Sequence, residues 1–162
     1  MPGDQQYLAS LISGVSCRPL RRYDDERGWL AEIYRQYELA AEHFPVMAYI
    51  SVTLPGIGRG PHAHRRQTDL FCFPGPGEFR VFLWDQRPDS PTFQARQEFQ
   101  LGQSCPGVLI VPPGVVHGYR NVSEVAGLVC NFANRLYRGL GRLEPVDEIR
   151  FEDDADSPFR LE

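Results

Sequence analysis

Glycine and proline residues divide this chain of 162 residues into short apolar segments, and this division restricts the possible folds. The chain has 15 glycines and 14 prolines, and turns are indicated at 55–56, 74–77, 88–91 and 112–114. Between the turns, alternating or continuous apolar runs predict strands. These are residues 46–53, 70–73, 79–84, 95–101, 108–111 and 127–132. Many short strands at near-regular spacing predict an all-β sandwich or barrel.

The other segments are short. We expect short flanking helices over residues 8–15 and 37–43. The acidic segment 145–162 is either a solvated extension or a packed C-terminal element. The length suits one hydrophobic core, so we expect a single domain over residues 1–162 with its core at about 24–140.

Charge and composition exclude several classes of function. The formal net charge of −4 argues against a broad nucleic-acid surface. All 17 basic residues are arginines, and without lysine the chain cannot form a Schiff base or anchor pyridoxal phosphate. Four cysteines without a Cys-x-x-Cys pair are expected to be reduced thiols of a cytoplasmic protein. The first residues lack a signal-peptide pattern and no apolar run is long enough to span a bilayer, so we expect no membrane partner.

Three of the four histidines lie in two short segments. His62 and His64 are two residues apart, and in an extended strand such residues point to the same face. His117 follows a Pro-Pro-Gly turn and can meet them from a second strand. Three converging imidazoles can move protons or hold a metal ion. The fourth, His43, is interpreted as an ordinary helical or loop residue.

The two histidine segments follow the two motifs of cupins. The first motif runs from a glycine through His-x-His and an acid to a later glycine, and the second ends Pro-x-Gly-x-x-His-x-x-x-Asn. In this chain these positions are Gly56, His62, His64, Asp69 and Gly75, and then Pro112, Gly114, His117 and Asn121. Both motifs in order, with a strand-rich stretch between them, predict a cupin-type jelly roll. In metal-binding cupins the ligands would match His62, His64, Asp69 and His117, a donor set that suits one divalent transition metal.

Over residues 24–158 the chain resembles dTDP-4-dehydrorhamnose 3,5-epimerases and related sugar-nucleotide enzymes. The matching segments are Asp24-Asp25-Glu26-Arg27-Gly28, Arg59-Gly60-x-His62, Asp85-x-Arg87-x-x-Ser90-Pro91-Thr92, Pro112-Pro113-Gly114-Val115-Val116-His117-Gly118 and Phe151-Glu152-Asp153-Asp154. We interpret Asp85 and Arg87 as residues that shape the turn after Trp84. The His62-Ala63-His64 sequence also resembles the sugar-nucleotide 3,4-ketoisomerases.

The resemblance implies proton transfer next to the ketone of a 4-keto-6-deoxy sugar nucleotide, without a cofactor. His62 matches the base, and its partner carboxylate would be Asp153, or Asp154 in a shifted register. Arg59 and Arg27 match residues that hold the diphosphate, since a guanidinium pairs well with phosphate oxygens. The full set of implied substrate-binding residues is Arg27, Glu32, Arg59, His64, Gln67 and His117. A strand that crosses to a neighbour in the family implies a homodimer.

Several positions depart from the family. A family lysine, which supplies positive charge near the developing enolate, falls at Asp69. The family's tyrosine acid falls at Cys130, so Cys130 or a water would act as the acid. Two polar pocket residues of the family fall at Met47 and Tyr49.

These departures leave three functions open. The leading interpretation is a sugar-nucleotide epimerase or isomerase with an altered pocket. The second is a metal-binding cupin in which Asp69 becomes a ligand and the metal acts as a Lewis acid. The third is a sugar-binding cupin without catalytic activity.

Overall fold

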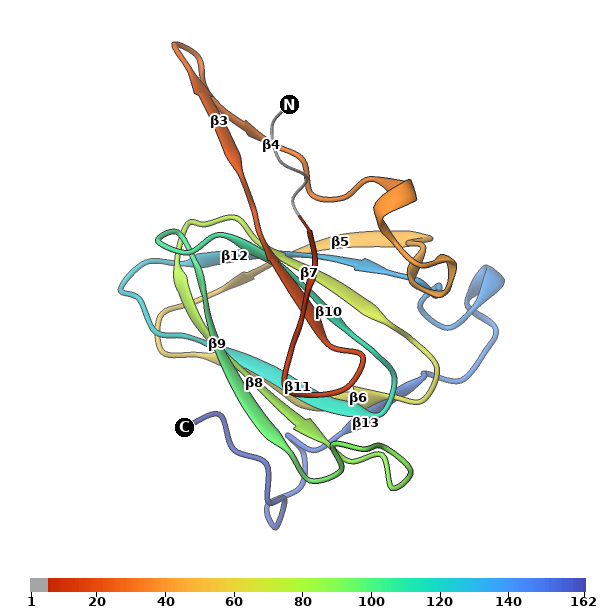
Figure 1. Cartoon of the computed structure of the whole chain (residues 1–162). Coiled ribbons are helices and arrows are strands. Elements are labelled where there is room, and N and C mark those ends of the chain that lie inside the picture. The colour runs from red at the N-terminus through yellow and green to blue at the C-terminus, as the bar shows by residue number, and fades with distance from the viewer. Residues whose placement is uncertain (1–5) are drawn as a thin grey trace.

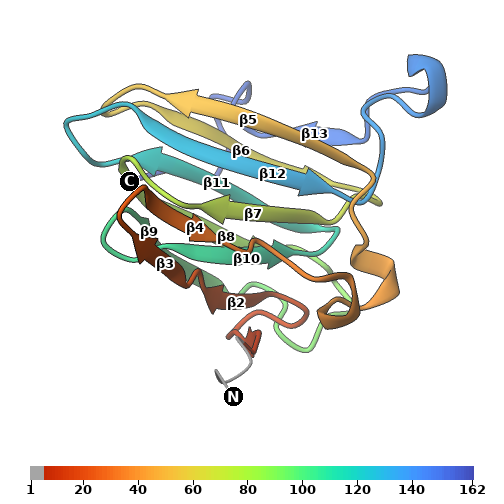
Figure 2. The same ribbon diagram turned by 90° about the horizontal axis from the view of Figure 1, so that it is seen from above.

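The computed structural model describes residues 6–162, whose main strands form two facing antiparallel sheets (Figures 1 and 2). One sheet has the order β1 (Leu8–Ala9), β2 (Ser16–Pro19), β10 (Gly107–Val111), β7 (Asp69–Phe73), β12 (Gly127–Ala133) and β5 (Met47–Thr53). The other has the order β13 (Glu148–Arg150), β6 (Gly58–His64), β11 (Val115–Asn121), β8 (Glu78–Asp85) and β9 (Arg96–Gly102). The predicted all-β, cupin-type jelly roll is confirmed as an open sandwich of two sheets that do not close into a barrel.

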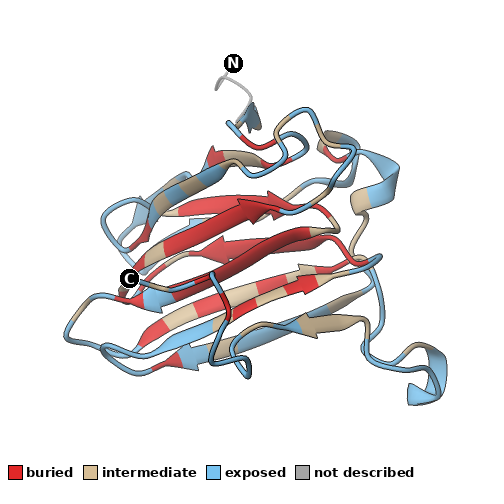
Figure 3. Ribbon diagram, turned by 90° about the horizontal axis from the view of Figure 1, so that it is seen from below, coloured by how far each residue is buried: buried red, intermediate tan, exposed pale blue. Residues whose placement is uncertain are grey.

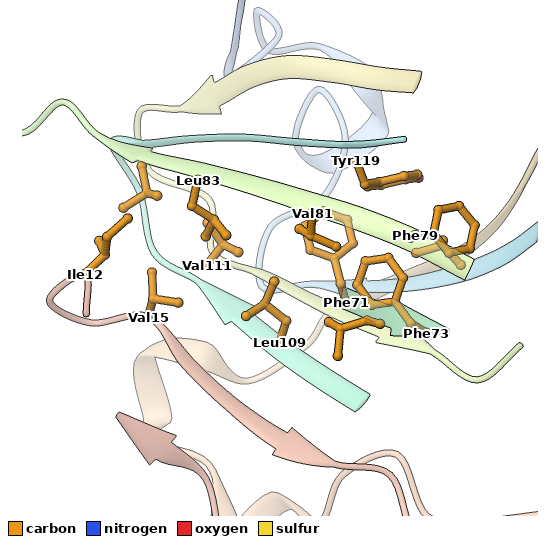
Figure 4. Packing of buried hydrophobic residues seen from close by; sticks show 13 residues of the cluster. Ile12, Val15, Phe71, Phe73, Phe79, Val81, Leu83, Leu109, Val111 and Tyr119 are labelled. Atoms are coloured by element: carbon orange, nitrogen blue, oxygen red, sulfur yellow. The ribbon is translucent and has the colours of Figure 1, made fainter. Parts of the chain in front are cut away.

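The central strands carry the hydrophobic core between the sheets. Figure 3 shows that burial is concentrated in these strands. Alternate residues point inward, so Phe71 and Phe73 of β7 meet Tyr119 of β11 at ring-centroid distances of 6.1 and 5.7 Å (Figure 4). Ile12 and Val15 cover this core from the N-terminal segment. The candidate site lies in a cavity at the edge of the sandwich, between β5 and the strands β6 and β13.

The helix predicted over residues 8–15 is wrong. Leu8 and Ala9 pair with Cys17 and Ser16 as a short antiparallel hairpin. Gly14 turns the chain with φ of +80°, a conformation that favours glycine. Tertiary pairing with β2 and burial of Ile12 therefore override the local helical pattern.

The other helical segments are single turns. The helix predicted over 37–43 is replaced by two 3-10 turns, Gln36–Glu38 and Ala41–His43. A third 3-10 turn, Leu140–Arg142, lies in the loop that follows β12. The hairpin of β3 (Arg22–Asp25) and β4 (Gly28–Ala31) extends away from the sandwich (Figure 1).

The acidic C-terminal segment is packed, which decides between the two expectations for it. Its strand β13 pairs with β6, so that Glu148 lies opposite His64 and Arg150 opposite His62. Farther on, Phe159 is buried against Trp84, with ring centroids 5.3 Å apart. The segment therefore supplies the edge strand β13 of the five-stranded sheet and covers the outer face of that sheet.

The Asp-x-Arg-x-x-Ser-Pro-Thr segment is a structural turn, as the sequence indicated. The buried carboxylate of Asp85 accepts hydrogen bonds from the Arg87 side chain, from Ser90 Oγ and from Thr92 Oγ1. Burial opposes the ionised form, but these donors outweigh it and hold the pKa of Asp85 well below its usual range. Asp85 thus fixes the loop between β8 and β9.

Candidate functional site

The structure brings the three predicted histidines together with Asp69. His62 and His64 point to the same side of β6, and the register places His117 of β11 opposite His62. The ring centroid of His62 lies 4.5 Å from that of His117 and 5.5 Å from that of His64. Gly60 permits this approach of β6 to β11, because a Cβ there would lie 2.8 Å from the carbonyl oxygen of His117. Asp69 reaches the cluster from β7 of the facing sheet.

Asp69 is the centre of a buried polar network. Its Oδ1 accepts hydrogen bonds from Gln67 Nε2 at 2.8 Å and Asn131 Nδ2 at 2.7 Å. Its Oδ2 lies 3.1 Å from His64 Nε2 and 3.2 Å from His117 Nε2. Burial alone would raise the pKa of Asp69, but its close contacts with the two histidines keep it well below its usual range. The position of the family's lysine therefore carries an anion in this chain.

The same contacts act on the two histidines. Burial opposes the charged form of His64, but the adjacent charge of Asp69 outweighs this and raises the pKa of His64. In His117, Nδ1 lies 2.9 Å from the carbonyl oxygen of Val115 and donates its proton there. Asp69 therefore favours the charged form of His64, while the contact with Val115 orients the ring of His117.

A divalent metal ion also fits this cluster. One ligand atom from each of His62, His64, Asp69 and His117 lies within 4.8 Å of the others. Asp69 Oδ2 and His117 Nε2 are buried, and neither makes a well-aligned hydrogen bond. Imidazole nitrogens with one carboxylate oxygen are a donor set for a transition metal. The geometry thus accommodates either protons or a cation between Asp69 and the imidazoles.

His62 has a second carboxylate beside it. Its Nδ1 lies 3.7 Å from Glu148 Oε1, and the other oxygen of Glu148 accepts a hydrogen bond of 2.8 Å from Arg150 Nε. Burial, together with the neighbouring His117 and His64, lowers the pKa of His62 to about 2. His62 is therefore a neutral imidazole near pH 7, with a carboxylate placed to stabilise it after it accepts a proton.

A cavity of about 480 Å³ opens at this edge of the sandwich. One wall is β5, with Met47 and Tyr49, and the opposite wall is formed by His62, His64 and Glu148 of β6 and β13. The loop over 134–147 forms the rim. The volume is typical of a small-molecule site, since such pockets measure about 300–1,000 Å³.

Tyr49 presents a phenol to this cavity. Its hydroxyl oxygen accepts a hydrogen bond of 2.9 Å from Asn131 Nδ2, and the two residues are paired across β5 and β12. Burial raises the pKa of Tyr49 to about 12, so the phenol stays protonated at neutral pH. Asn131 also binds Asp69, which connects the phenol to the histidine network.

Two predicted catalytic residues lie elsewhere. Cys130 packs with Leu70 and Cys72 on the outer face of the six-stranded sheet, because the alternation of β12 turns its neighbour Asn131 inward. Asp153 is exposed in a turn, and the described residues include no contact between it and His62. The geometry therefore does not support Cys130 as the acid or Asp153 as the partner of the base.

The predicted substrate-binding residues divide into two groups. His64 and Gln67 line the cavity, and His117 lies behind His62. Arg59 donates to Thr53 Oγ1 and to the carbonyl oxygen of Val52, beside β5. Arg27 at the tip of the β3–β4 hairpin is paired with Asp25, and Glu32 is paired with Arg35. The structure thus does not bring Arg27 and Glu32 to the cavity of the same chain.

Glu148 and Asn131 contact the cluster but were not predicted as site residues. Glu148 lies in an acidic segment where nothing distinguishes it from its neighbours until β13 pairs with β6. Asn131 is adjacent to Cys130, and a shift of one residue in a strand reverses the face. The inward alternation of Val129, Asn131 and Ala133 was the signal that could have identified it.

Comparison with known proteins places this site in a family. The jelly-roll sandwich with histidines in its cavity first defines a protein of the cupin class. A family model for dTDP-4-dehydrorhamnose 3,5-epimerase matches residues 9–143. This chain belongs to the dTDP-4-dehydrorhamnose 3,5-epimerase family.

Individual relatives agree with this membership. The chain is 35% identical over 127 residues to the spore coat polysaccharide biosynthesis protein SpsL of Bacillus subtilis, covering 78% of this chain and 83% of SpsL. It is 34% identical, also over 127 residues, to the probable low-salt glycan biosynthesis epimerase Agl13 of Haloferax volcanii, covering 78% and 81%. The crystal structure of a dTDP sugar isomerase from Desulfovibrio desulfuricans superposes with a TM-score of 0.79 at 25% identity, covering 95% and 94%. Among residues 6–162, no helix is both long and apolar enough to cross a membrane.

Proposed function

We propose that this protein is an epimerase or isomerase that acts on a 4-keto-6-deoxy sugar nucleotide of the dTDP-sugar class. The observation that carries the proposal is the neutral imidazole of His62, which lines a small-molecule cavity with a carboxylate behind it. Family membership supports the same chemistry. The names of SpsL and Agl13 support a role in the synthesis of a polysaccharide or other glycan.

In this mechanism, His62 removes the proton from the carbon next to the ketone. The C–H bond breaks, its electron pair forms the enolate, and the imidazole becomes an imidazolium. Glu148 stabilises this imidazolium and takes the role that sequence analysis gave to Asp153. His64, whose charged form Asp69 favours, supplies positive charge on the same side of the cavity.

The diphosphate of the substrate is an anion, and the rim of the cavity carries several arginines. Arg66, Arg135 and Arg138 lie around the opening. Arg135 and Arg138 each donate through Nε to a backbone carbonyl, so the rest of each guanidinium remains directed to solvent or substrate. Arg59 adds a guanidinium beside β5. These groups can pair with phosphate oxygens.

We also propose that the protein is a cytoplasmic homodimer. Arg27, with its side chain 83% exposed, is on a hairpin that extends from the sandwich, and a hairpin of this kind can reach the cavity of a second copy. All four cysteines are free thiols, which suits a reducing compartment. Light scattering on the purified protein should give a mass near twice that of the 18.4 kDa chain. A monomeric mass at assay concentration would contradict this assembly.

We propose that no cofactor is required, and this separates the epimerase from the metal-binding alternative. Family membership does not favour that alternative. If a metal occupied His62, His64, Asp69 and His117, it would supply Lewis-acid character at the cluster. Elemental analysis of protein made without a histidine tag should find less than about a tenth of an equivalent of any transition metal, with unchanged activity after chelator treatment. Stoichiometric metal and loss of activity on its removal would support the alternative.

Deuterium exchange tests the base. In D₂O, the wild-type protein should incorporate solvent deuterium next to the ketone of a dTDP-4-keto-6-deoxy sugar. The H62N variant should lose this exchange while its thermal unfolding stays cooperative. H43N is the matched control, because His43 lies outside the cavity. If wild-type protein exchanges no substrate of this class, the epimerase proposal fails; binding that stabilises the protein without exchange would indicate a sugar-binding cupin.

A further inference from the structure

Inversion at a carbon atom needs proton transfer on two opposite faces. A base removes the proton from one face of the sugar, and a donor must return one to the other face. In this cavity, His62 and His64 belong to the same strand of the five-stranded sheet, and His117 belongs to the neighbouring strand. These imidazoles therefore approach a substrate from the same side. The second group must come from the facing sheet or from the rim.

The six-stranded sheet offers one protonated side chain at the cavity wall. Among the described residues of its edge strand β5, only Met47 and Tyr49 line the cavity, and Met47 has no proton to give. Asp69 also belongs to this sheet, but it is buried behind the histidines. Cys130 lies on the outer face. The geometry points to Tyr49 as the catalytic acid that completes the inversion, an inference that rests on the proposed epimerase function.

Asn131 prepares Tyr49 for this role. The amide of Asn131 donates to the hydroxyl oxygen of Tyr49 at 2.9 Å, so the phenol proton is free to point into the cavity. The second contact of Asn131, to Asp69 Oδ1 at 2.7 Å, fixes the amide in this orientation. Asp69 is itself held by His64 and His117. One network of hydrogen bonds and ion pairs thus positions the acid and the imidazoles.

The proposed reaction balances without an added reagent. His62 takes the proton from one face, and the electron pair remains in the enolate. The O–H bond of Tyr49 breaks as its proton forms a new C–H bond on the opposite face. The tyrosinate regains a proton from solvent and His62 releases one to solvent, so the net change is the inversion alone. Asn131 stabilises the transient tyrosinate by its hydrogen bond.

The Y49F variant separates the two half-reactions. Without the phenol, His62 can still remove the substrate proton and return a deuteron to the same face. In D₂O, Y49F should therefore incorporate deuterium with retained configuration, whereas formation of the inverted product falls by about 100-fold or more. N131L, which removes the hydrogen bond to the phenol, should lower inversion in the same direction while leaving exchange measurable.

Control variants make the assignment specific. Y119F removes the buried phenol of Tyr119 on β11, whose hydroxyl bonds Ser51 of β5. This phenol does not line the cavity, so Y119F should invert the substrate at the wild-type rate. Tyr137 is a rival phenol at the rim. If Y49F inverts as fast as wild type, or if Y137F alone stops inversion, the assignment is overturned while H62N still tests the base. If H62N exchanges like wild type, the proposed function fails instead.

Discussion

Replacing Asp69 by Asn tests the buried network of the site. The change preserves the shape of the side chain, and its amide oxygen can still accept from Gln67 and Asn131. It removes the charge that lies 3.1 Å from His64 and 3.2 Å from His117. A hydrogen bond to a charged group contributes about 1.5–3 kcal/mol, and breaking a buried ion pair costs about 3–5 kcal/mol. We expect D69N to lose about 3–5 kcal/mol of unfolding free energy, because two contacts are weakened at once.

Urea denaturation at pH 7 measures this loss of unfolding free energy. The protein is first treated with a chelator, so that bound metal does not contribute to its stability. For a chain of this length the same loss lowers Tm by roughly 6–20 °C. D153N is the matched control, since it makes the same chemical change on an exposed carboxylate. If the unfolding free energies of D69N and wild type agree within about 0.5 kcal/mol, the carboxylate is not paired with the imidazoles and the reasoning is refuted.

Three further variants examine single contacts. E148Q should lower kcat/KM about tenfold and move the acidic limb of its pH profile to lower pH. The reason is that the carboxylate 3.7 Å from His62 favours the imidazolium, and E148Q removes its charge. A pH profile like that of wild type would exclude Glu148 as the partner of His62. D85N should lose about 3 kcal/mol of unfolding free energy at pH 7, because the donors around Asp85 lose their charged acceptor. Because the folded-state pKa of Asp85 is depressed, its contribution to stability is present above about pH 4 and is lost as the pH falls. The difference in unfolding free energy between wild type and D85N should therefore shrink below about pH 4, which urea denaturation measures. C130S should keep wild-type kcat, since this thiol faces away from the cavity; a loss of about 100-fold would restore it as the acid.

The fold could be predicted because the positions of the turn residues agreed with the apolar runs between them. Turn residues separated the strands, and each of the six predicted strands overlaps an observed one, with boundaries shifted by at most one residue. The spacing of His62, His64 and His117 predicted their convergence, since strand alternation fixes which residues share a face. The sequence did not predict β1, β2, β3, β4 or β13. Of these, β1 and β13 are short strands that form only by pairing with a neighbour.

The same limit applies to the predicted partner of His62. Asp153 and Glu148 belong to one acidic segment, and only the pairing of β13 with β6 determines which carboxylate faces His62. The partner of the base was therefore a question of register, which the sequence leaves open when acids are frequent. Arg27 lies on an exposed hairpin away from the cavity of its own chain, so its predicted role depends on the proposed homodimer.

The proposed acid, Tyr49, illustrates how an apparent loss in a sequence can be compensated in the fold. The expected position on β12 holds Cys130, which suggested that the cavity had lost its tyrosine. In the structure, the inward residue of β12 is Asn131, and its partner across the pair is Tyr49 on β5. Side chains of paired residues lie close enough to occupy the same part of a cavity. A phenol can therefore be supplied by the adjacent strand, with an amide beside it to hold the hydroxyl. Asn131 also donates to Asp69, which lies at the position of the family's lysine. Asp69 therefore helps to hold the amide that positions the Tyr49 phenol.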